Sequence, residues 1–479
     1  MYTKESKDQL EFENFHLPFN GKLDKSNRWV TLSKLIPWDK IEDKYSKKFS
    51  EKKGAPALPL RTALGALIIK ERCGLTDEET VAQIIENPYL QYFLGFKEYR
   101  SEPPFDSSMM VHFRKRINLD MMTEINDLVI KATNVNEAKE EDNTDKPEQE
   151  EKSTEKPKND GVLMFDATCA PADIRYPTDI SLLNEAREKL EAMIDTVYEN
   201  SNHAEKKPRT YREIARKKFL AFIGQKKPKV KIVRKALKNQ LEYVSRNIKH
   251  LTKLVEDNPN ILHCLKKKEY KDLLVITELY RQQQAMFDKK IHRVDFRIVS
   301  ISQPHIRPIV RGKASANVEF GAKLTVSLKD GFSRLEKHSW ENFNESTLLK
   351  DHVLHYFETH GVYPKVVAAD KIYHNKDNKL FCKEHGIKMT LGMMPAELIE
   401  DAQTSKSIRN AIEGKFGEAK RRYSLARIMA KLDTTAKSVV GVIILIMNLE
   451  KKLRLLLSNF LFQLFSFLKL VKRKKLAEI

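Results

Sequence analysis

The stretch 137–160, EAKEEDNTDKPEQEEKSTEKPKND, constrains the fold of this 479-residue chain more than any other. It holds ten acids, five bases and no aromatic or branched aliphatic side chain. Such a composition cannot bury enough apolar surface to offset the entropy lost on ordering, so it predicts a disordered acidic linker at 136–160. The chain therefore divides into an N-terminal module, 1–135, and a longer part that follows the linker.

The N-terminal module is expected to be helical. Apolar residues at 60, 64, 67 and 68 fall on one face of a helix within 59–73. Thr76 and Glu79 have the spacing of a capping box that opens the next helix. Ser107 is expected to open a basic helix that carries Arg114. Two interpretations stay open for this module: a DNA-binding domain of the helix-turn-helix type, or a plain helical bundle.

A long helical pattern occupies 183–295. Its apolar residues recur at alternating spacings of three and four, and over 230–255 they do so for nearly four heptads. This spacing predicts a helical hairpin or a small coiled-coil bundle. Within it, the stretch 203–253 holds 17 lysines and arginines but three acids, a net charge of +14. A solvated helix face usually mixes both signs, so this stretch favours a phosphate-binding surface, with a plain solvated face as the alternative.

Strand-like runs flank the helical pattern on both sides. GVLMFDAT (161–168) indicates a buried strand that ends at Asp166, and RIVSIS (297–302) indicates another strand. A hairpin is expected to turn at Asp330-Gly331, and the strands after it alternate with helices. This order predicts an α/β fold, a mixed sheet flanked by helices with the helical bundle inserted into it. The sheet domain is assigned to 161–182 and 296–430, and the inserted bundle to 183–295.

The C-terminal segment, 431–479, is apolar and ends in the basic tail LVKRKK. Two apolar runs, 438–450 and 455–471, are expected to form a pair of helices that is buried or faces an oligomer partner. The second run is about 17 residues long, which is the lower limit for a membrane span. A membrane-associated tail is therefore the alternative, although no membrane is expected as a partner.

Two aspartates and one glutamate are the candidate metal ligands. Asp166 and Asp370 each follow a strand-like run, VLMF and VVAA, and ligands of open α/β sheets gather at the carboxyl ends of strands. A pair of carboxylates suits Mg²⁺, and Glu413, on an expected helix, would seat a second ion. Arg409 and Lys420, on the same helix, would hold phosphates near the metals. The alternative is that the strand-end acids only form turns or cap helices.

The charge balance indicates a polyanionic partner. The 86 lysines and arginines exceed the 66 aspartates and glutamates by 20, an excess that suits nucleic acid or an acidic membrane. The four cysteines contain no CxxC pair, which makes a zinc finger or a disulfide framework improbable. The charged N-terminus does not have the form of a signal peptide, so a bacterial cytoplasmic, nucleoid-associated location is expected.

Four blocks after the linker, in this order, resemble the DDE transposases of bacterial insertion sequences, which have an RNase H-like catalytic core. The stretch RTALGALIIKERCGLTDEETVAQIIENPYLQYFLGF also resembles the N-terminal domain common in that group. The resemblance covers most of the chain apart from the linker and the extreme C-terminus. The four blocks are FDATCAPADIRYPTDISLLNEAREKLE, QPHIRPIVRGKASANVEFGAKL, VVAADKIYHNKDN and RNAIEGKFGEAKRRYSLARIMAKL.

The resemblance implies roles for individual residues. Asp166, Asp370 and Glu413 match the three acids that hold two Mg²⁺ ions in the family, with Mn²⁺ as a substitute. Arg409, Glu413 and Lys420 keep the family's spacing, but the tyrosine three residues before the arginine is Lys406 here. This departure affects the phosphate contact near the cleaved end. Further expected DNA contacts are Arg311, Lys313, Arg421 and Arg422.

Each acid has rivals close by in the sequence. Asp173 and Asp179 follow Asp166 closely, but Asp166 is preferred because it alone is expected to end the strand. Glu418 is the rival of Glu413 and faces about 140° away on the same expected helix. His352 and His355, three residues apart, have a spacing that could share a metal, but no obvious third ligand accompanies them, and packed histidines are the plainer interpretation.

The resemblance implies a DNA transposase that binds the terminal inverted repeats of an insertion sequence. It would cut DNA and transfer strands by a two-metal mechanism, without a covalent protein intermediate. Its partners would be double-stranded DNA, as transposon ends and target, and a second copy of the chain in a homodimer. The alternative is an inactive or repurposed transposase-derived protein that only binds DNA.

Overall fold

The computed structural model describes residues 15–18, 21–47, 49, 56–141, 159–201, 206–310, 318–391 and 411–477. The chain forms two compact units. The first, here the sheet unit, comprises 1–170, 323–338 and 343–479; the second, here the bundle unit, comprises 171–322 and 339–342. The predicted division into an N-terminal domain, linker, core, inserted bundle and C-terminal helices stays a prediction.

Seven helices open the sheet unit, as the N-terminal pattern predicts. The Thr76 hydroxyl accepts from the backbone N–H of Glu79 at 3.0 Å, which confirms the predicted helix start. The basic helix begins at Met109 instead of just after Ser107, because Asp106 forms a turn there by accepting from the N–H of Ser108. The helices are α1 (Arg28–Leu35), α2 (Trp38–Ser46), α3 (Leu60–Cys73), α4 (Asp77–Glu86), α5 (Pro88–Phe93), α6 (Met109–Arg116) and α7 (Leu119–Glu141).

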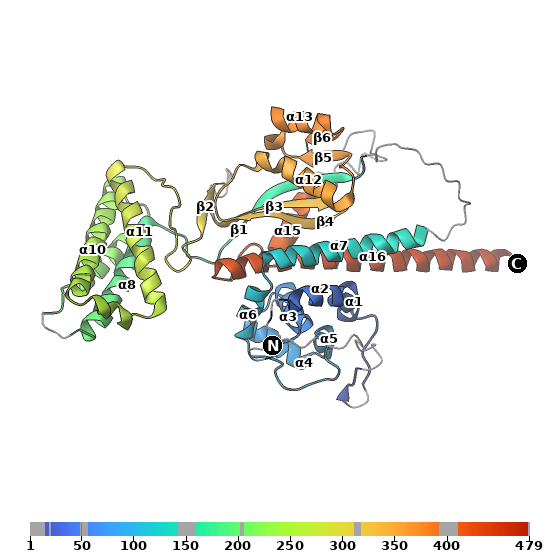
Figure 1. Cartoon of the computed structure of the whole chain (residues 1–479), viewed down its shortest axis with the longest axis horizontal. Coiled ribbons are helices and arrows are strands. Elements are labelled where there is room, and N and C mark those ends of the chain that lie inside the picture. Colours follow the sequence, from blue (N-terminus) through green and yellow to red (C-terminus); the bar gives the residue numbers. More distant parts are fainter. Residues whose placement is uncertain are drawn as a thin grey trace. The chain divides into compact units, whose positions relative to one another are not determined.

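Helix α7 packs against the C-terminal helix α16 (Asp433–Ala477), as Figure 1 shows. Because α7 runs to Glu141, the first residues of the predicted linker, 136–141, are helical. The predicted pair of C-terminal helices is wrong: α16 is one continuous helix, since no proline or glycine separates the two apolar runs. Among the described residues, no helix is both long and apolar enough to cross a membrane.

The sheet unit contains a mixed sheet with helices against it, an α/β arrangement as predicted. The strand order is β2-β3-β1-β5-β6, with β4 paired to β3; the residues of β2 and the first residues of β3, up to 322, are counted in the bundle unit. β1 pairs parallel with β5, and β5 parallel with β6. Asp330 and Gly331, both at positive φ, form the predicted hairpin turn between β3 and β4. The strands are β1 (Val162–Pro171), β2 (Arg307–Val310), β3 (Val318–Lys329), β4 (Phe332–Ser339), β5 (Val366–Ala369) and β6 (Lys388–Leu391).

One face of the sheet packs on two helices, α12 (Leu349–His360) and α13 (Lys376–Glu384). Leu163 and Phe165 of β1 and Val367 of β5 point into this core together with Leu349. Because side chains alternate along a strand, the even-numbered residues of β1 and β5 lie on the opposite face. Short 3₁₀ helices η4 (Glu345–Leu348) and η5 (Lys371–Tyr373) and the helix α15 (Ala411–Arg422) complete the unit.

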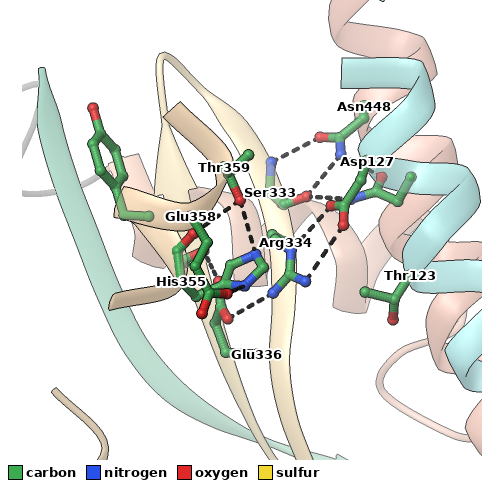
Figure 2. Close-up of polar contacts among 12 residues, drawn as sticks. Thr123, Asp127, Ser333, Arg334, Glu336, His355, Glu358, Thr359 and Asn448 are labelled. Carbon is green, nitrogen blue, oxygen red and sulfur yellow. Dashed lines mark hydrogen bonds and ion pairs between the residues drawn. The ribbon is translucent and has the colours of Figure 1, made fainter. Parts of the chain in front are cut away.

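Two buried asparagines, Asn126 of α7 and Asn448 of α16, bond to strand β4, and Figure 2 shows Asn448 beside Ser333 of that strand. The Asn448 amide accepts from the N–H of Ser333 at 2.8 Å and donates to its carbonyl at 2.7 Å. Asn126 donates to the same carbonyl at 3.1 Å and accepts from Asn448. These side chains satisfy strand groups that would otherwise be open to pairing with another strand.

The bundle unit has its own core, formed by α8, α10 and α11 with the turn η3. Leu190, Val244 and Ile276 are among its fully buried residues, as the alternating spacing predicts. RIVSIS is not a strand: Ile298 and Ile301 pack into the bundle core, and the N–H of Ile298 donates to the Gln282 side chain. The elements are α8 (Asp179–Glu199), α9 (Arg212–Ile223), α10 (Val230–Asp257), η3 (Pro259–Cys264) and α11 (Lys267–Lys289).

Candidate active site

The first two predicted acids lie at neighbouring parallel strands: Asp166 is on β1, and Asp370 directly follows β5. Val162, Leu163 and Met164 of β1 pair with residues 366, 367 and 368 of β5, a constant offset of 204. The same offset places Asp166 opposite Asp370, on strands about 4.8 Å apart. Both residues have even numbers, so both lie on the face of the sheet that α12 and α13 do not cover.

The strand positions of the two acids differ from the prediction in one respect. Asp370 directly follows β5, as predicted, but β1 does not end at Asp166 and continues to Pro171. The reason is that β1 has two neighbours in the sheet: the shorter one, β5, ends opposite Phe165, whereas the longer one, β3, continues beside β1 as far as the bond from the N–H of Ala172 to the carbonyl of Phe320. The apolar run VLMF therefore indicated where β1 stops pairing with β5, and not where β1 itself ends.

The buried hydroxyl of Tyr373 interacts electrostatically with both aspartates. Its side chain is fully buried, and burial followed by the charges of Glu345, Asp166 and Asp370 raises the pKa of its hydroxyl. Three carboxylates therefore act on one buried atom. Glu345 is paired with Lys323 at 2.6 Å, whereas the side chain of Asp370 is exposed and makes no hydrogen bond or ion pair with a described residue. Tyr373 and Glu345 were not among the predicted site residues, and only the position of Tyr373 just after Asp370 could have pointed to one of them.

Helix α15 carries the third predicted acid in its first turn. Glu413 is exposed, without a hydrogen bond or ion pair to a described residue. Its rival Glu418 is tied into a cluster of cations: it pairs with Lys415 at 3.4 Å, with Arg454 and, at 3.8 Å, with Arg422. Burial alone would raise the pKa of Glu418, but the hydrogen bond from Arg454 and the Lys415 charge lower it below the usual value. This network gives Glu418 a structural role and leaves Glu413 available to a ligand.

Two family profiles match this chain. Residues 17–116 match a transposase domain (DUF772), and residues 367–450 match a transposase DDE domain. The second match includes Asp370 and Glu413 and begins after Asp166. The chain is also similar to "uncharacterized protein ORF8 in nfe locus" of Rhizobium meliloti, at 33% identity over 161 residues, which are 34% of this chain and 70% of that protein. No solved structure matches the chain.

The chain belongs to the DDE transposases of insertion sequences. As a DNA transposase it is an enzyme whose partner is DNA, and this family generally uses a divalent metal ion. Within the described residues of this transposase, no three acids, histidines or cysteines lie close enough together to hold a metal. The neighbouring strands β1 and β5 carry Asp166 and lead to Asp370. That Glu413 approaches these two aspartates stays a prediction.

Several predicted DNA contacts of the transposase cannot be placed. Arg409, Arg311 and Lys313 lie outside the described residues, as does Lys406. On α15, Lys420 lies two turns after Glu413 and is half-buried. Arg421 and Arg422 follow it and are exposed, the Arg421 Nε donating to the carbonyl of Gly417 at 3.2 Å.

The rivals of Asp166 belong to the bundle unit. Asp179 begins α8, where it pairs with Arg297 at 2.6 Å and accepts from Gln283 at 2.9 Å, so its charge already stabilises that unit. Arg307 of β2, four residues before Arg311, is paired with Glu341 at 2.9 Å and donates to the carbonyl of Pro304. These contacts explain both residues as parts of the scaffold.

The histidine pair of α12 is packed, as the plainer interpretation has it. His352 is buried with its ring 5.1 Å from that of Phe165, and the Nε2 of His355 lies 3.2 Å from the Thr359 hydroxyl. Both line a cavity of about 330 Å³ that also borders Leu163. None of the three predicted acids lines this cavity.

Proposed function

We propose that this transposase cuts DNA at the ends of an insertion sequence and joins those ends to target DNA, through an RNase H-like core that holds Mg²⁺. The observation that supports the proposal is the parallel pairing of β1 with β5, whose offset of 204, extended by two residues beyond the last pair, brings Asp166 opposite Asp370. Two carboxylates at one edge of a sheet are hard oxygen ligands of the kind Mg²⁺ takes. Glu413, unpaired among the described residues, is the third ligand we propose.

We assign separate roles to the residues that would hold the metal ions and to those that would bind the phosphates. Asp166 is fixed by its own backbone, because its Oδ1 accepts from the N–H of Ala167 at 2.7 Å, and this bond orients the carboxylate. Asp370 and Glu413 complete the ligand set. When bound, a pair of Mg²⁺ ions supplies the charge that activates a water or a 3′-hydroxyl and stabilises the leaving oxygen. Lys420, with Arg421 and Arg422, would hold the flanking phosphates.

The terminal inverted repeats would be recognised by other parts of the chain. The N-terminal helices, which match the transposase domain, are the proposed DNA-binding module. Arg114 of α6 does not take part, because it is buried and forms a bidentate pair with Asp77 at 2.9 and 2.6 Å. We further propose that two copies act together on the two ends, because both ends of an element must be joined to one target.

The test is Mg²⁺-dependent nicking of supercoiled DNA that carries the element's own ends. Asp370→Asn keeps the shape of the side chain but removes the charge, so we expect nicking to fall by at least about a thousandfold while DNA binding is retained. The control is Asp351→Asn on α12, which is also exposed and lies outside the proposed ligand set. Normal nicking by Asp370→Asn would refute the assignment, and DNA binding without any nicking by the wild type would favour the inactive alternative.

A matched pair on α15 tests the third acid. Glu413→Gln should abolish nicking and leave the unfolding temperature unchanged, because its side chain makes no bond with a described residue. Glu418→Gln should lower the unfolding temperature and keep most of the activity, because it breaks the contacts with Lys415 and Arg454. The reverse pattern would exchange the roles of the two glutamates.

A further inference from the structure

One end of the bundle unit carries a dense group of cations without acid partners. It comprises α9 and the first turns of α10, here the basic end, 212–238. We infer that the basic end is a second DNA-binding surface of this transposase, one that holds the phosphate backbone of duplex DNA without reading its sequence. The inference rests on the proposed function only for the identity of the partner, DNA, and not for any step of cleavage.

The charge of the basic end is uncompensated. Between residues 206 and 238 the only acid is Glu213. Asp195 of α8 neutralises Arg212 and Lys207, at 2.8 and 2.9 Å. Nine further exposed cations form no ion pair with any described acid: Arg216, Lys217, Lys218, Lys226, Lys227, Lys229, Lys231, Arg234 and Lys235.

Several cations elsewhere in the bundle unit are paired with acids. Arg187 is paired with Glu191 at 2.7 Å, and Lys189 with Asp272 at 2.7 Å. Arg281 is paired with Glu278 even though it is exposed. Nine cations without an ion pair to a described acid within 20 consecutive residues concentrate positive potential at that end, which attracts a polyanion.

The helix geometry presents these cations outward. On α10 the core side is marked by Leu241 and Val244, which are buried. Lys231 and Lys235 are one turn apart on the solvent side, and Lys238, which pairs with Glu242 at 3.9 Å, follows about 10 Å beyond the first of them. A row of cations along a rigid helix can contact several successive phosphates at once.

Aliphatic side chains are exposed among these cations. Val230 is 83% exposed, although the alternating apolar spacing runs through it, so the spacing extends beyond the core of the bundle. Side chains of this type contact thymine methyl groups or wedge between base steps when cations hold the backbone. The exposed aliphatic residues are Ile214, Leu220, Ile223, Val230 and Ile232.

A membrane surface is the other polyanion to consider. A helix that lies on a membrane keeps a continuous apolar face free for the lipid. In α9 the apolar side is already used, because Ala215 and Phe219 are buried in the bundle unit. The exposed aliphatic residues are instead interleaved with lysines, as Ile214 is with Arg216 and Lys217. The arrangement therefore suits DNA.

The test compares two full-length variants of equal charge. The basic-end variant carries Lys226→Gln, Lys227→Gln, Lys229→Gln and Lys231→Gln. The control carries Lys266→Gln, Lys267→Gln, Lys268→Gln and Lys271→Gln. These lysines are exposed at the start of α11, which follows the far end of α10, a helix roughly 40 Å long. Affinity is measured over a series of salt concentrations on two duplexes, one with the element end and one of random sequence.

We expect the basic-end variant to bind both duplexes about tenfold or more weakly. Its plot of log K against log salt should become shallower by about 0.9 for each phosphate that the substituted lysines no longer neutralise. The control should resemble the wild type. An unchanged slope, an equal change in the control, a weakening restricted to the element end, or wild-type binding to phosphatidylglycerol vesicles but not to DNA would overturn the inference. Arg216→Gln with Lys217→Gln on α9 is an independent second variant, should the first fail to fold.

The outcome is separable from that of the proposed function. A protein that shows the expected salt slopes but never nicks DNA would refute the proposed cleavage and retain this surface. If the wild type nicks DNA at the ends of the element and the basic-end variant binds DNA as tightly as the wild type, only this surface is refuted.

Discussion

The buried imidazole of His352 makes the stability of the sheet unit depend on pH. Burial, followed by the charges of Arg334, His355 and Lys337, lowers the pKa of His352 from 6.5 to about 4. Below pH 6.5 the unfolded chain binds a proton at this residue, whereas the folded chain stays neutral until about pH 4. The stability contributed by the neutral ring is therefore complete above pH 6.5 and is lost as the pH falls to about 4, which amounts to about 3 kcal/mol.

Replacing this ring should remove that dependence. We expect His352→Gln to lose less free energy of unfolding than the wild type between about pH 7.5 and pH 4.5, by about 2–3 kcal/mol. The measurement is urea denaturation at several pH values, with the exposed His112→Gln as the control. Parallel curves for the wild type and His352→Gln would show that the imidazole does not resist protonation in the folded chain.

At the same scale, local pairs of residues were predictable from the sequence and distant ones were not. Thr76 and Glu79 are three residues apart, so their spacing alone predicted the helix cap. Asn448 lies 322 residues from Asn126, and nothing in the spacing indicates that two amides so far apart would bond to one strand. The same holds for Asp166 and Asp370: their residue types were found from the sequence, but their register comes only from the pairing of β1 and β5.

At the scale of elements, two helical glycines meet opposite surroundings. A methyl group on Gly441 of α16 would lie 2.7 Å from the Cβ of Met122, so this glycine lets α16 approach α7 closely. A methyl group on Gly414 of α15 would meet nothing within 4 Å. We expect Gly414→Ala to stabilise the protein by about 0.5–1 kcal/mol and Gly441→Ala to destabilise it by about 1–2 kcal/mol. Chemical denaturation measures both, and equal signs would contradict the close packing of α7 on α16.

The elements also show where periodicity stops being informative. The spacing of three and four located α8, α10 and α11, because a helix repeats its buried face within the sequence itself. RIVSIS has the composition of a strand, but its apolar side chains found their partners in the bundle. An apolar run states that a segment is buried and does not state what covers it. The end of β1 was misplaced for the same reason, since its length depends on β3.

At the scale of the whole molecule, the two units have separate hydrophobic cores. The bundle core consists of buried side chains between residues 182 and 301. The core under the sheet consists of buried side chains from β1, β5, α12 and α13. Leu190 of α8 and Leu349 of α12 are each fully buried, one in each core. A leucine truncated to alanine at such a site costs about 2–5 kcal/mol, and the cost is borne by the unit whose core is damaged.

We therefore expect the units to respond one at a time in hydrogen exchange followed by mass spectrometry of the full chain. Leu190→Ala should speed exchange in α8, α10 and α11 and leave β5 and α13 as in the wild type, and Leu349→Ala should do the reverse. The two variants control for each other, because they delete the same atoms from sites of equal burial. Faster exchange throughout the chain in either variant would mean that the units unfold together. Independent units would allow this transposase to bind DNA through the basic end of the bundle while the sheet that carries Asp166 and Asp370 keeps its register.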